Sequence, residues 1–295
     1  GYVQNGEQAL WIVFYPLYPL LIKFVASLIS NYELSAVLIS LTFSILASIS
    51  LYKLALLDFP KSVALKAVWF LTIFPTSYFL QSAYTESLFL ALILGSFYAA
   101  RRGKWWLAGI LGGLASATRL AGIFLLPALL WEWWEQNKIN PPAGGEKLKM
   151  KNLFNLLPIF LVSAGLLWYM RYLAINYQDP LMFLHSQPAF GAQRVVDKII
   201  LLHQVFWRYF KMIATTKFDP LYFTVWLEFL SAVLFGSLLV FGYLRKIRLS
   251  YLIFAFLAYI TPTLTGTFSS MPRYVLVLFP CFIALALIKN KLFRF

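Results

Sequence analysis

Charged residues are scarce in this chain, and three of them stand where helices of an apolar protein would begin or end: Glu86, Arg119 and Arg273. Polar side chains flank them, namely Gln81, Tyr84, Thr85, Ser87, Thr118 and Tyr274. A carboxylate, two guanidinium groups and several hydroxyls suit a ligand that carries sugar hydroxyls and a lipid-linked phosphate, because a planar guanidinium donates to two phosphate oxygens at once. The alternative is a buried Glu–Arg pair that only locks helices together.

Two further charges, Arg171 and Glu228, interrupt apolar runs, where an unpaired charge is costly. Arg171 can extend to the membrane surface and Glu228 can pair with a neighbour, so a structural role is predicted for each. His185 and Gln187 follow the turn at Asp179-Pro180. A single histidine in such a loop is as consistent with a solvated surface residue as with a ligand-binding one.

The sequence offers no cluster of His or carboxylate residues at metal-ligand spacing, so neither an essential metal nor another cofactor is expected. Cys281 is the single cysteine and lies inside an apolar run. This excludes an intramolecular disulfide and a cysteine metal cluster, and Cys281 is predicted to be a packing residue.

The composition excludes a soluble domain. Hydrophobic residues make up 61% of the chain and charged residues 12%, with a mean hydropathy of +0.75. Soluble domains have roughly 25% charged residues. The net charge of +14 does not indicate a nucleic-acid partner, because Lys and Arg occur as short clusters between apolar runs and not as one basic face. The predicted solvent is the lipid bilayer.

Nine apolar runs are separated by charged or turn-forming clusters. They cover about 32–52, 63–77, 79–100, 105–117, 121–135, 153–174, 220–243, 251–266 and 273–288. Several are shorter than the ~20 residues that an upright helix needs to cross the hydrocarbon core. These short runs are expected to be tilted, broken or re-entrant.

Basic clusters occupy alternate loops of this nine-span arrangement. They are Lys53/Lys61/Lys66, Arg101/Arg102/Lys104, Lys138/Lys147/Lys149/Lys151, Arg245/Lys246/Arg248 and Lys289/Lys291/Arg294. Loops rich in Lys and Arg face the cytoplasm, which predicts an integral, multi-pass membrane protein. Glu86, Arg119 and Arg273 then lie at the outer helix ends and can converge on one outward-facing cavity.

Two outward segments are predicted to lie along the membrane surface. The proline-interrupted aromatic run around Pro16 and Pro19 indicates an interfacial helix, and residues 195–213 have the pattern of an amphipathic helix. Residues 136–152 form the clearest cytoplasmic linker, and no internal repeat is visible. The predicted fold is therefore an all-α, polytopic transmembrane helix bundle forming a single domain, 1–295, with interfacial helices in its extracytoplasmic loops.

Four motifs are spread over nearly the whole chain: FYPLYPL at 14–20, FPTSYF at 74–79 running into AYTESLF at 83–89, ATRLAG at 117–122, and SMPRY at 270–274. Together they resemble the glycosylphosphatidylinositol mannosyltransferase II family, the PIG-V-like proteins of the GT-C class of polytopic glycosyltransferases. The Tyr-Thr-Glu-Ser-Leu block is the most specific part. Residues 179–187, with His185 and Gln187, also resemble the large outer loop of that family.

The resemblance implies a GT-C-type bundle that transfers mannose or a similar sugar, with inversion, from a polyprenyl-phosphate-linked donor to an extracytoplasmic acceptor hydroxyl. The acceptor could be a glycolipid, a glycan or a protein. The membrane would be the plasma membrane of a prokaryote or the endoplasmic reticulum of a eukaryote.

The resemblance also implies roles for individual residues. Family members carry a catalytic aspartate shortly before a Gly-Tyr pair similar to Gly1-Tyr2, so the chain is expected to lack its first span and first catalytic loop and to be an inactive fragment. Arg119 and Arg273 are the candidates for binding the departing phosphate, with His185 a weaker third. Glu86 is the retained catalytic candidate, although it more plausibly orders hydroxyls or holds an arginine. Tyr84, Gln187 and Tyr274 complete the predicted substrate-binding set.

A transporter or flippase of lipid-linked sugars is the main alternative, since such proteins also use intramembrane charges and broken helices. A transporter should show repeated halves and charges near the bilayer midplane, and the sequence shows neither. A non-catalytic scaffold would explain the hydrophobicity but not the set of Glu and Arg residues at one face.

Overall fold

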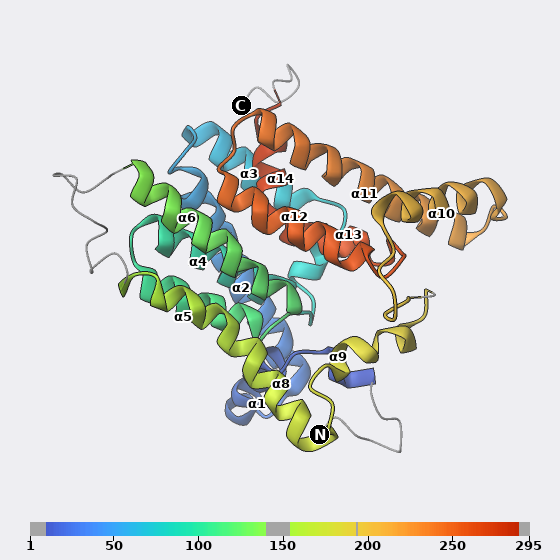
Figure 1. The fold of residues 1–295 in the computed structure, drawn as a ribbon, viewed down its shortest axis with the longest axis horizontal. Helices are drawn as coiled ribbons and strands as arrows, with labels where there is room; N and C mark the ends of the chain where they lie inside the picture. The colour runs from blue at the N-terminus through green and yellow to red at the C-terminus, as the bar shows by residue number, and fades with distance from the viewer. Residues whose placement is uncertain (1–9, 140–153, 193, 289–295) are drawn as a thin grey trace.

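The computed structural model describes residues 10–139, 154–192 and 194–288, and all regular secondary structure in these ranges is helical (Figure 1). The predicted all-α, polytopic bundle is confirmed. Gly1-Tyr2 and most of the predicted linker, residues 140–152, lie outside the described ranges.

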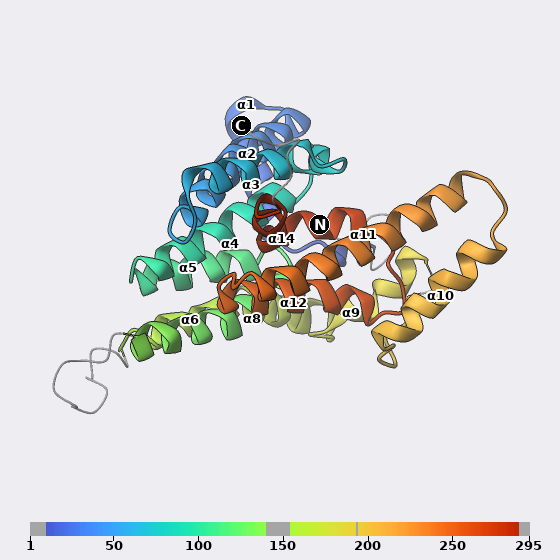
Figure 2. The ribbon, with the colours of Figure 1, turned by 90° about the horizontal axis from the view of Figure 1, so that it is seen from above.

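Helix α4 (Glu86–Arg101) is the central helix of the bundle, and nearly all of its residues are buried. It packs against α2 (Tyr32–Ala55) and α5 (Trp105–Ser116). Figure 2 shows α4 between α2 on one side and α6 (Leu125–Ile139) on the other. Because α4 is apolar on all sides between its charged ends, burial among other helices is the stable arrangement.

A second buried helix, α14 (Phe279–Ala286), packs between α3 (Lys61–Ile73) and α11 (Pro220–Leu244). Cys281 lies on it, fully buried, with its thiol directed at the carbonyl of Phe235. Helix α12 (Leu249–Thr263) packs against α6 and α11. The two buried helices, α4 and α14, thus form the interior of the bundle.

Helix α5 carries small residues where it meets η4 (Leu157–Ser163) and α8 (Ala164–Tyr177). A Cβ on Gly109 would lie 1.9 Å from the carbonyl oxygen of Pro158, and one on Gly165 would lie 2.1 Å from that of Gly113. Small residues let membrane helices approach closely enough for backbone contact. This contact fixes the end of α5 from which Arg119 follows.

Three of the predicted runs are broken at one end of the bundle. A 3₁₀ turn, η2 (Ser77–Leu80), and an irregular segment precede α4, η3 (Leu120–Phe124) precedes α6, and α13 (Met271–Tyr274) with η6 (Val275–Val277) precedes α14. Prolines contribute to two of these breaks, because proline cannot donate the backbone hydrogen bond that would continue a helix. Each break carries one of the polar sequence motifs.

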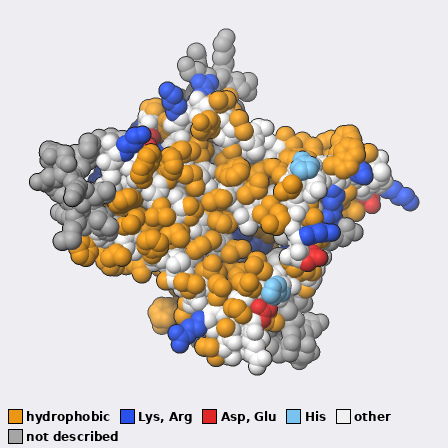
Figure 3. Space-filling model, in the orientation of Figure 1, with side chains coloured by type: hydrophobic (Ala, Val, Ile, Leu, Met, Phe, Trp, Pro, Cys, Tyr) orange, Lys and Arg blue, Asp and Glu red, His pale blue; other side chains and the backbone are white. Residues whose placement is uncertain are grey.

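In the described part of the chain, three helical segments are long and apolar enough to cross a membrane: Tyr32–Ala55, Leu157–Tyr177 and Pro220–Leu244. The apolar helices Trp105–Ser116 and Leu249–Thr263 are shorter, as is α1 (Leu17–Ile29). Hydrophobic side chains cover the middle of the face in Figure 3, and most of its Lys and Arg lie toward the edges. This surface fits a lipid environment, and the side of the membrane that each loop faces stays a prediction.

The predicted amphipathic helix over 195–213 is only partly correct. Helix α10 covers Leu202–Thr215, and the preceding residues are not helical. The amides of Val195 and Ile200 instead donate to the carbonyls of Thr265 and Leu264, both at 3.0 Å. The backbone of this segment is therefore paired with the end of α12, an alternative that helical periodicity does not reveal.

The aromatic run near the N-terminus forms η1 (Leu10–Val13) and α1, and α1 packs against α2. The Tyr18 hydroxyl bonds to Ser40 at 2.8 Å and donates to the Ala36 carbonyl at 3.1 Å. Pro16 stands just before the helix, where its missing N–H leaves no unmet hydrogen bond. The run is thus anchored on the bundle through a buried tyrosine.

We expect Gly165→Ala to destabilise the protein, because the added methyl group would overlap backbone atoms of α5 that have little room to move. Overpacking of this kind costs about 1–3 kcal/mol. Gly95→Ala is the matched control, since its Cβ would meet only a side-chain carbon of Leu111 at 3.2 Å. Thermal unfolding in detergent gives the melting temperature of each variant. Equal melting temperatures for Gly165→Ala and Gly95→Ala would contradict the close contact between α5 and α8.

Candidate functional site

Glu86, the first residue of α4, is the centre of an ionic cluster. Its side chain is fully buried, and its Oε1 accepts a hydrogen bond from Nη1 of Arg119 at 2.6 Å. The same oxygen accepts one from Nε of Arg273. The structure therefore brings together the three charged residues that the sequence singles out, from α4, from the turn after α5 and from α13.

Both guanidinium groups lie against the faces of aromatic rings. Arg273 lies over the rings of Tyr84 and Phe79, at 4.5 and 5.5 Å from their centroids. Arg119 lies over the ring of Tyr274 at 5.4 Å. A cation over an aromatic face is attracted by the negative charge density of the ring. Tyr84 and Tyr274, predicted to bind substrate, thus contact the two arginines.

The arginines border a cavity of about 400 Å³, a size typical of small-molecule sites. Its polar lining residues are Tyr15, Thr85, Thr118, Arg119, Gln187, Arg194, Thr261, Thr265, Ser269, Ser270, Arg273 and Tyr274. Three guanidinium groups and no carboxylate belong to this lining, as far as the described residues go. Glu86 lies behind the arginines, so the cavity has an excess of positive charge and many hydroxyls.

Gln187 and His185 have different positions although they are close in sequence. Gln187 begins η5 (Gln187–Phe190) and lines the cavity, where its side-chain oxygen accepts from Arg194 at 3.4 Å. His185 ends α9 (Met182–His185), is mostly exposed and does not belong to the lining. Its Nδ1 lies 2.7 Å from Oδ2 of Asp179, and this hydrogen bond lowers the pKa of the aspartate below its usual value.

Several polar residues of the lining were not predicted from the sequence as site residues, and Arg194 and Tyr15 are the most informative of them. Arg194 lies in a segment of mixed charge, and only its contact with Gln187 places it at the cavity. Tyr15 is almost fully buried, and its hydroxyl has no hydrogen-bond partner among the described residues. A buried hydroxyl without a partner is costly, so this group is available to a bound ligand. The aromatic motif at 14–20 was the signal for Tyr15.

Glu228 on α11 supports the turn that precedes α13, the short helix that carries Arg273. Its Oε1 accepts from the amide of Ser270 at 3.0 Å, and its Oε2 accepts from the Tyr209 hydroxyl at 2.6 Å. The Tyr209 hydroxyl in turn accepts from the amide of Phe268 at 3.1 Å. Ser270 has a φ of 65°, a left-handed conformation that costs energy for a residue other than glycine. Glu228 thus stabilises the strained turn at Ser270, and this is the structural role that the structure gives it.

A separate ionic network lies at the other end of α4. Glu132 on α6 is fully buried and accepts from Arg248 at 2.6 and 2.9 Å and from the Ser250 hydroxyl at 2.7 Å. Arg101 forms a two-pronged pair with Asp58 at 2.6 and 2.7 Å. These residues do not line the cavity, and they tie α4, α6, α12 and the α2–α3 turn together.

Comparisons of the sequence with known proteins gave two matches. A family model described as dolichyl-phosphate-mannose-protein mannosyltransferase matches residues 15–143. A mouse (Mus musculus) protein, GPI alpha-1,6-mannosyltransferase 2, is 35% identical over 98 residues. That match spans 32% of this chain and 20% of the mouse protein. No solved structure matches the chain. Each match carries the name of a mannosyltransferase, and both therefore support the resemblance to the PIG-V-like mannosyltransferases of the GT-C class that the motifs predict.

Proposed function

We propose that this protein is a membrane glycosyltransferase that transfers mannose, or a similar sugar, from a polyprenyl-phosphate-linked donor to an acceptor hydroxyl on the extracytoplasmic side. The observation that carries the proposal is the cavity with three arginines and no carboxylate in its described lining. Such a lining favours a ligand with concentrated negative charge, and a phosphate matches the guanidinium geometry.

The reaction would be a single displacement at the anomeric carbon, with inversion. The acceptor oxygen forms a bond to that carbon while the bond from the carbon to the donor phosphate oxygen breaks, and a base takes the acceptor proton. The departing phosphate gains negative charge in the transition state. Arg119 and Arg273 would stabilise that charge from fixed positions, which is the most effective form of electrostatic catalysis.

Glu86 serves best as a positioning residue in this scheme. Its Oε1 is engaged by both arginines and its side chain is fully buried behind them. It is therefore poorly placed to reach an acceptor proton, which a general base must do within hydrogen-bond distance.

The name of the family model supports the proposed donor, whereas the names of the two matches differ in the acceptor. The family model is named for dolichyl-phosphate-mannose, a polyprenyl-phosphate-linked sugar. One match names a protein as the mannosylated partner and the other a glycosylphosphatidylinositol. A glycolipid, a glycan and a protein all stay candidates for the acceptor. Tyr15 and the threonines of the lining would contact sugar hydroxyls.

Arg273→Ala in the full-length protein should lower kcat/KM for the lipid-linked donor by roughly 10- to 100-fold, because one charge-assisted contact to phosphate is lost. Arg273→Lys should restore only part of the activity, since an ammonium group cannot bind two oxygens in one plane. Assays with radiolabelled donor, followed by extraction of the product, measure kcat/KM for both variants.

Arg171→Ala is the matched control, because Arg171 lies on α8 and does not line the cavity. It should retain nearly full activity. Wild-type kcat/KM in Arg273→Ala would rule out the phosphate-binding role. Each variant is first checked for a monodisperse size-exclusion profile, so that loss of folding is not counted as loss of catalysis.

Glu228→Ala should raise the KM for the donor more than it lowers kcat, because the Ser270 turn would lose its acceptor and Arg273 its fixed position. Glu228→Gln should be close to wild type, since an amide oxygen can still accept from Ser270. Tyr209→Phe removes only one hydrogen-bond partner of Glu228. Its KM for the donor should therefore lie between those of Glu228→Ala and Glu228→Gln. A lower melting temperature in Glu228→Ala with unchanged KM and kcat would show that Glu228 stabilises the fold without positioning Arg273.

A further inference from the structure

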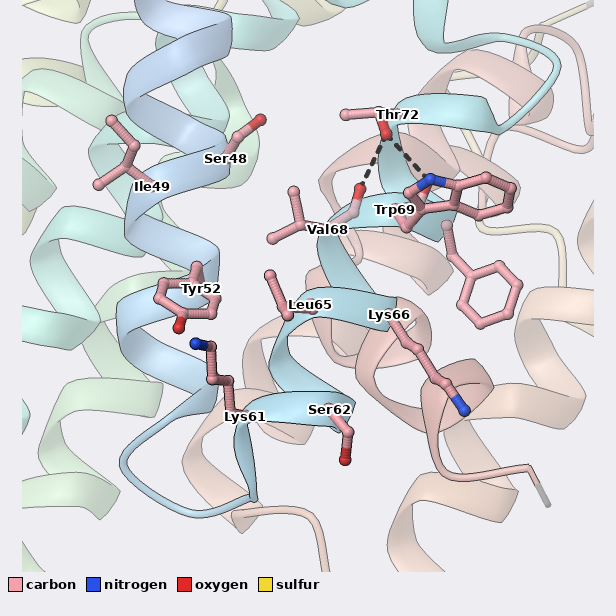
Figure 4. A pocket seen from close by; sticks show the side chains of 11 residues that line it. Ser48, Ile49, Tyr52, Lys61, Ser62, Leu65, Lys66, Val68, Trp69 and Thr72 are labelled. Carbon is pink, nitrogen blue, oxygen red and sulfur yellow. Dashed lines mark hydrogen bonds between the residues drawn. The ribbon is translucent and has the colours of Figure 1, made fainter. Parts of the chain in front are cut away.

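A second and larger hollow lies between α2 and α3, with a volume of about 760 Å³. Its lining residues are Ser48, Ile49, Tyr52, Lys61, Ser62, Leu65, Lys66, Val68, Trp69, Phe70 and Thr72 (Figure 4). It shares no residue with the arginine-lined cavity. We call this hollow the α2–α3 groove, and the proposed sugar transfer makes no use of it.

The walls of the α2–α3 groove are apolar and partly uncovered. Ile49 is 44% exposed, Leu65 51% and Trp69 47%. Large apolar side chains stay in contact with water only at a cost of roughly 25 cal/mol for each Å². In a bilayer this surface would be covered by hydrocarbon. A molecule that fills the groove must therefore be apolar over most of its length.

One end of the groove is polar and basic. Helix α3 begins at Lys61, directly after Pro60, and Ser62 and Tyr52 line the same end. Figure 4 shows the amino group of Lys61 directed toward the Tyr52 hydroxyl across the groove. Lys66 also lines the groove, although Figure 4 shows its amino group directed away from that of Lys61. The N-terminus of α3 contributes a further partial positive charge, which favours an anion.

Among the described residues, no carboxylate lines this end of the groove, and the lining contains neither Asp nor Glu. The acidic residue of the α2–α3 turn is Asp58, and its two carboxylate oxygens are engaged by Arg101 at 2.7 and 2.6 Å. Lys61 and Lys66 are therefore not balanced by the nearby aspartate, and an anionic ligand group complements them.

We propose that the α2–α3 groove binds an anionic membrane phospholipid. One acyl chain lies against Ile49, Leu65 and Trp69, and the phosphate lies at the end formed by Lys61, Ser62 and Tyr52. An amphiphile with one negative group matches an apolar slot with one basic end, and basic pockets between membrane helices commonly hold anionic lipid headgroups. A free phosphate would leave the apolar walls uncovered, and a neutral lipid would leave the lysines without a partner.

The position of the groove gives the lipid a structural effect. Helix α3 forms one wall of the groove and also packs against α14, which continues the segment that carries Arg273. A lipid between α2 and α3 would fill the space that the described residues leave open and so stabilise α3 in its place. The proposal does not depend on the sugar-transfer activity.

The test uses full-length protein in nanodiscs that contain a phosphatidylglycerol with a photoreactive diazirine in one acyl chain. Cross-linked peptides are then mapped by mass spectrometry. We expect adducts on α2 and α3 within the groove. In the double variant Lys61→Gln/Lys66→Gln, binding of the probe should weaken by roughly thirtyfold, from the contribution of about two lysines near a charged lipid.

The matched control is the double variant Lys23→Gln/Lys53→Gln, which removes two lysines of α1 and α2 that do not line the groove. It should keep wild-type labelling. A phosphatidylcholine probe with the same acyl chain should label the groove much more weakly than phosphatidylglycerol. Ile49→Trp, which fills the groove from α2, should reduce labelling by both probes.

Three results would overturn the proposal: equal labelling by the two probes, labelling that does not depend on Lys61 and Lys66, or no adducts in the groove. The last result would mean that another protein segment covers the α2–α3 groove. Melting temperatures of all variants, measured without added lipid, separate loss of the lipid site from loss of folding. Because none of these measurements reads sugar transfer, the outcome is independent of the proposed function.

Discussion

The buried carboxylate of Glu86 determines how one end of this bundle is arranged. A charge without solvent contact is tolerated only with opposite charge beside it, and breaking such a pair costs about 3–5 kcal/mol. Arg119 and Arg273 supply that charge from segments far apart in the sequence. The start of α4, the turn after α5 and the short helix α13 must therefore meet at one point. The chain is broken beside each of these three side chains, by η2 and an irregular segment, by η3 and by α13 with η6.

Helix α4 has an ionic network at each end, and the balance of charge distinguishes them. Near Arg101 the two arginines Arg101 and Arg248 face three carboxylates, Asp58, Glu132 and Glu135. In that network the carboxylates outnumber the arginines by one, so it has no excess positive charge to offer an anionic ligand. At the other end two arginines share one carboxylate, and a third borders the same cavity. The excess positive charge at the second end is the physical reason to assign a ligand there and a structural role to the first.

The helical fold followed directly from composition and apolar runs, since a chain surrounded by lipid must satisfy its backbone hydrogen bonds within each segment. The run at 32–52 became α2, and the run at 220–243 became α11. The predictions were weaker where helices break or begin. The helical stretch expected at 195–213 starts only at Leu202, because the residues before it pair with the end of α12. Such pairing joins distant segments and has no local signature.

The sequence by itself determined which charges required an explanation. Glu86, Arg119 and Arg273 stood out because few ionisable residues occur in apolar runs, and each of those that do must be compensated. It also predicted Gln187, Tyr84 and Tyr274 as site residues, and the two tyrosines contact the arginines. Only the tertiary structure decided how these groups are used: Glu86 lies behind the arginines, His185 pairs with Asp179 outside the cavity, and Arg194 joins the lining. The reason is that residue type and spacing give the cost of burying a charge, whereas the partner that offsets the cost depends on contacts between segments far apart in the chain.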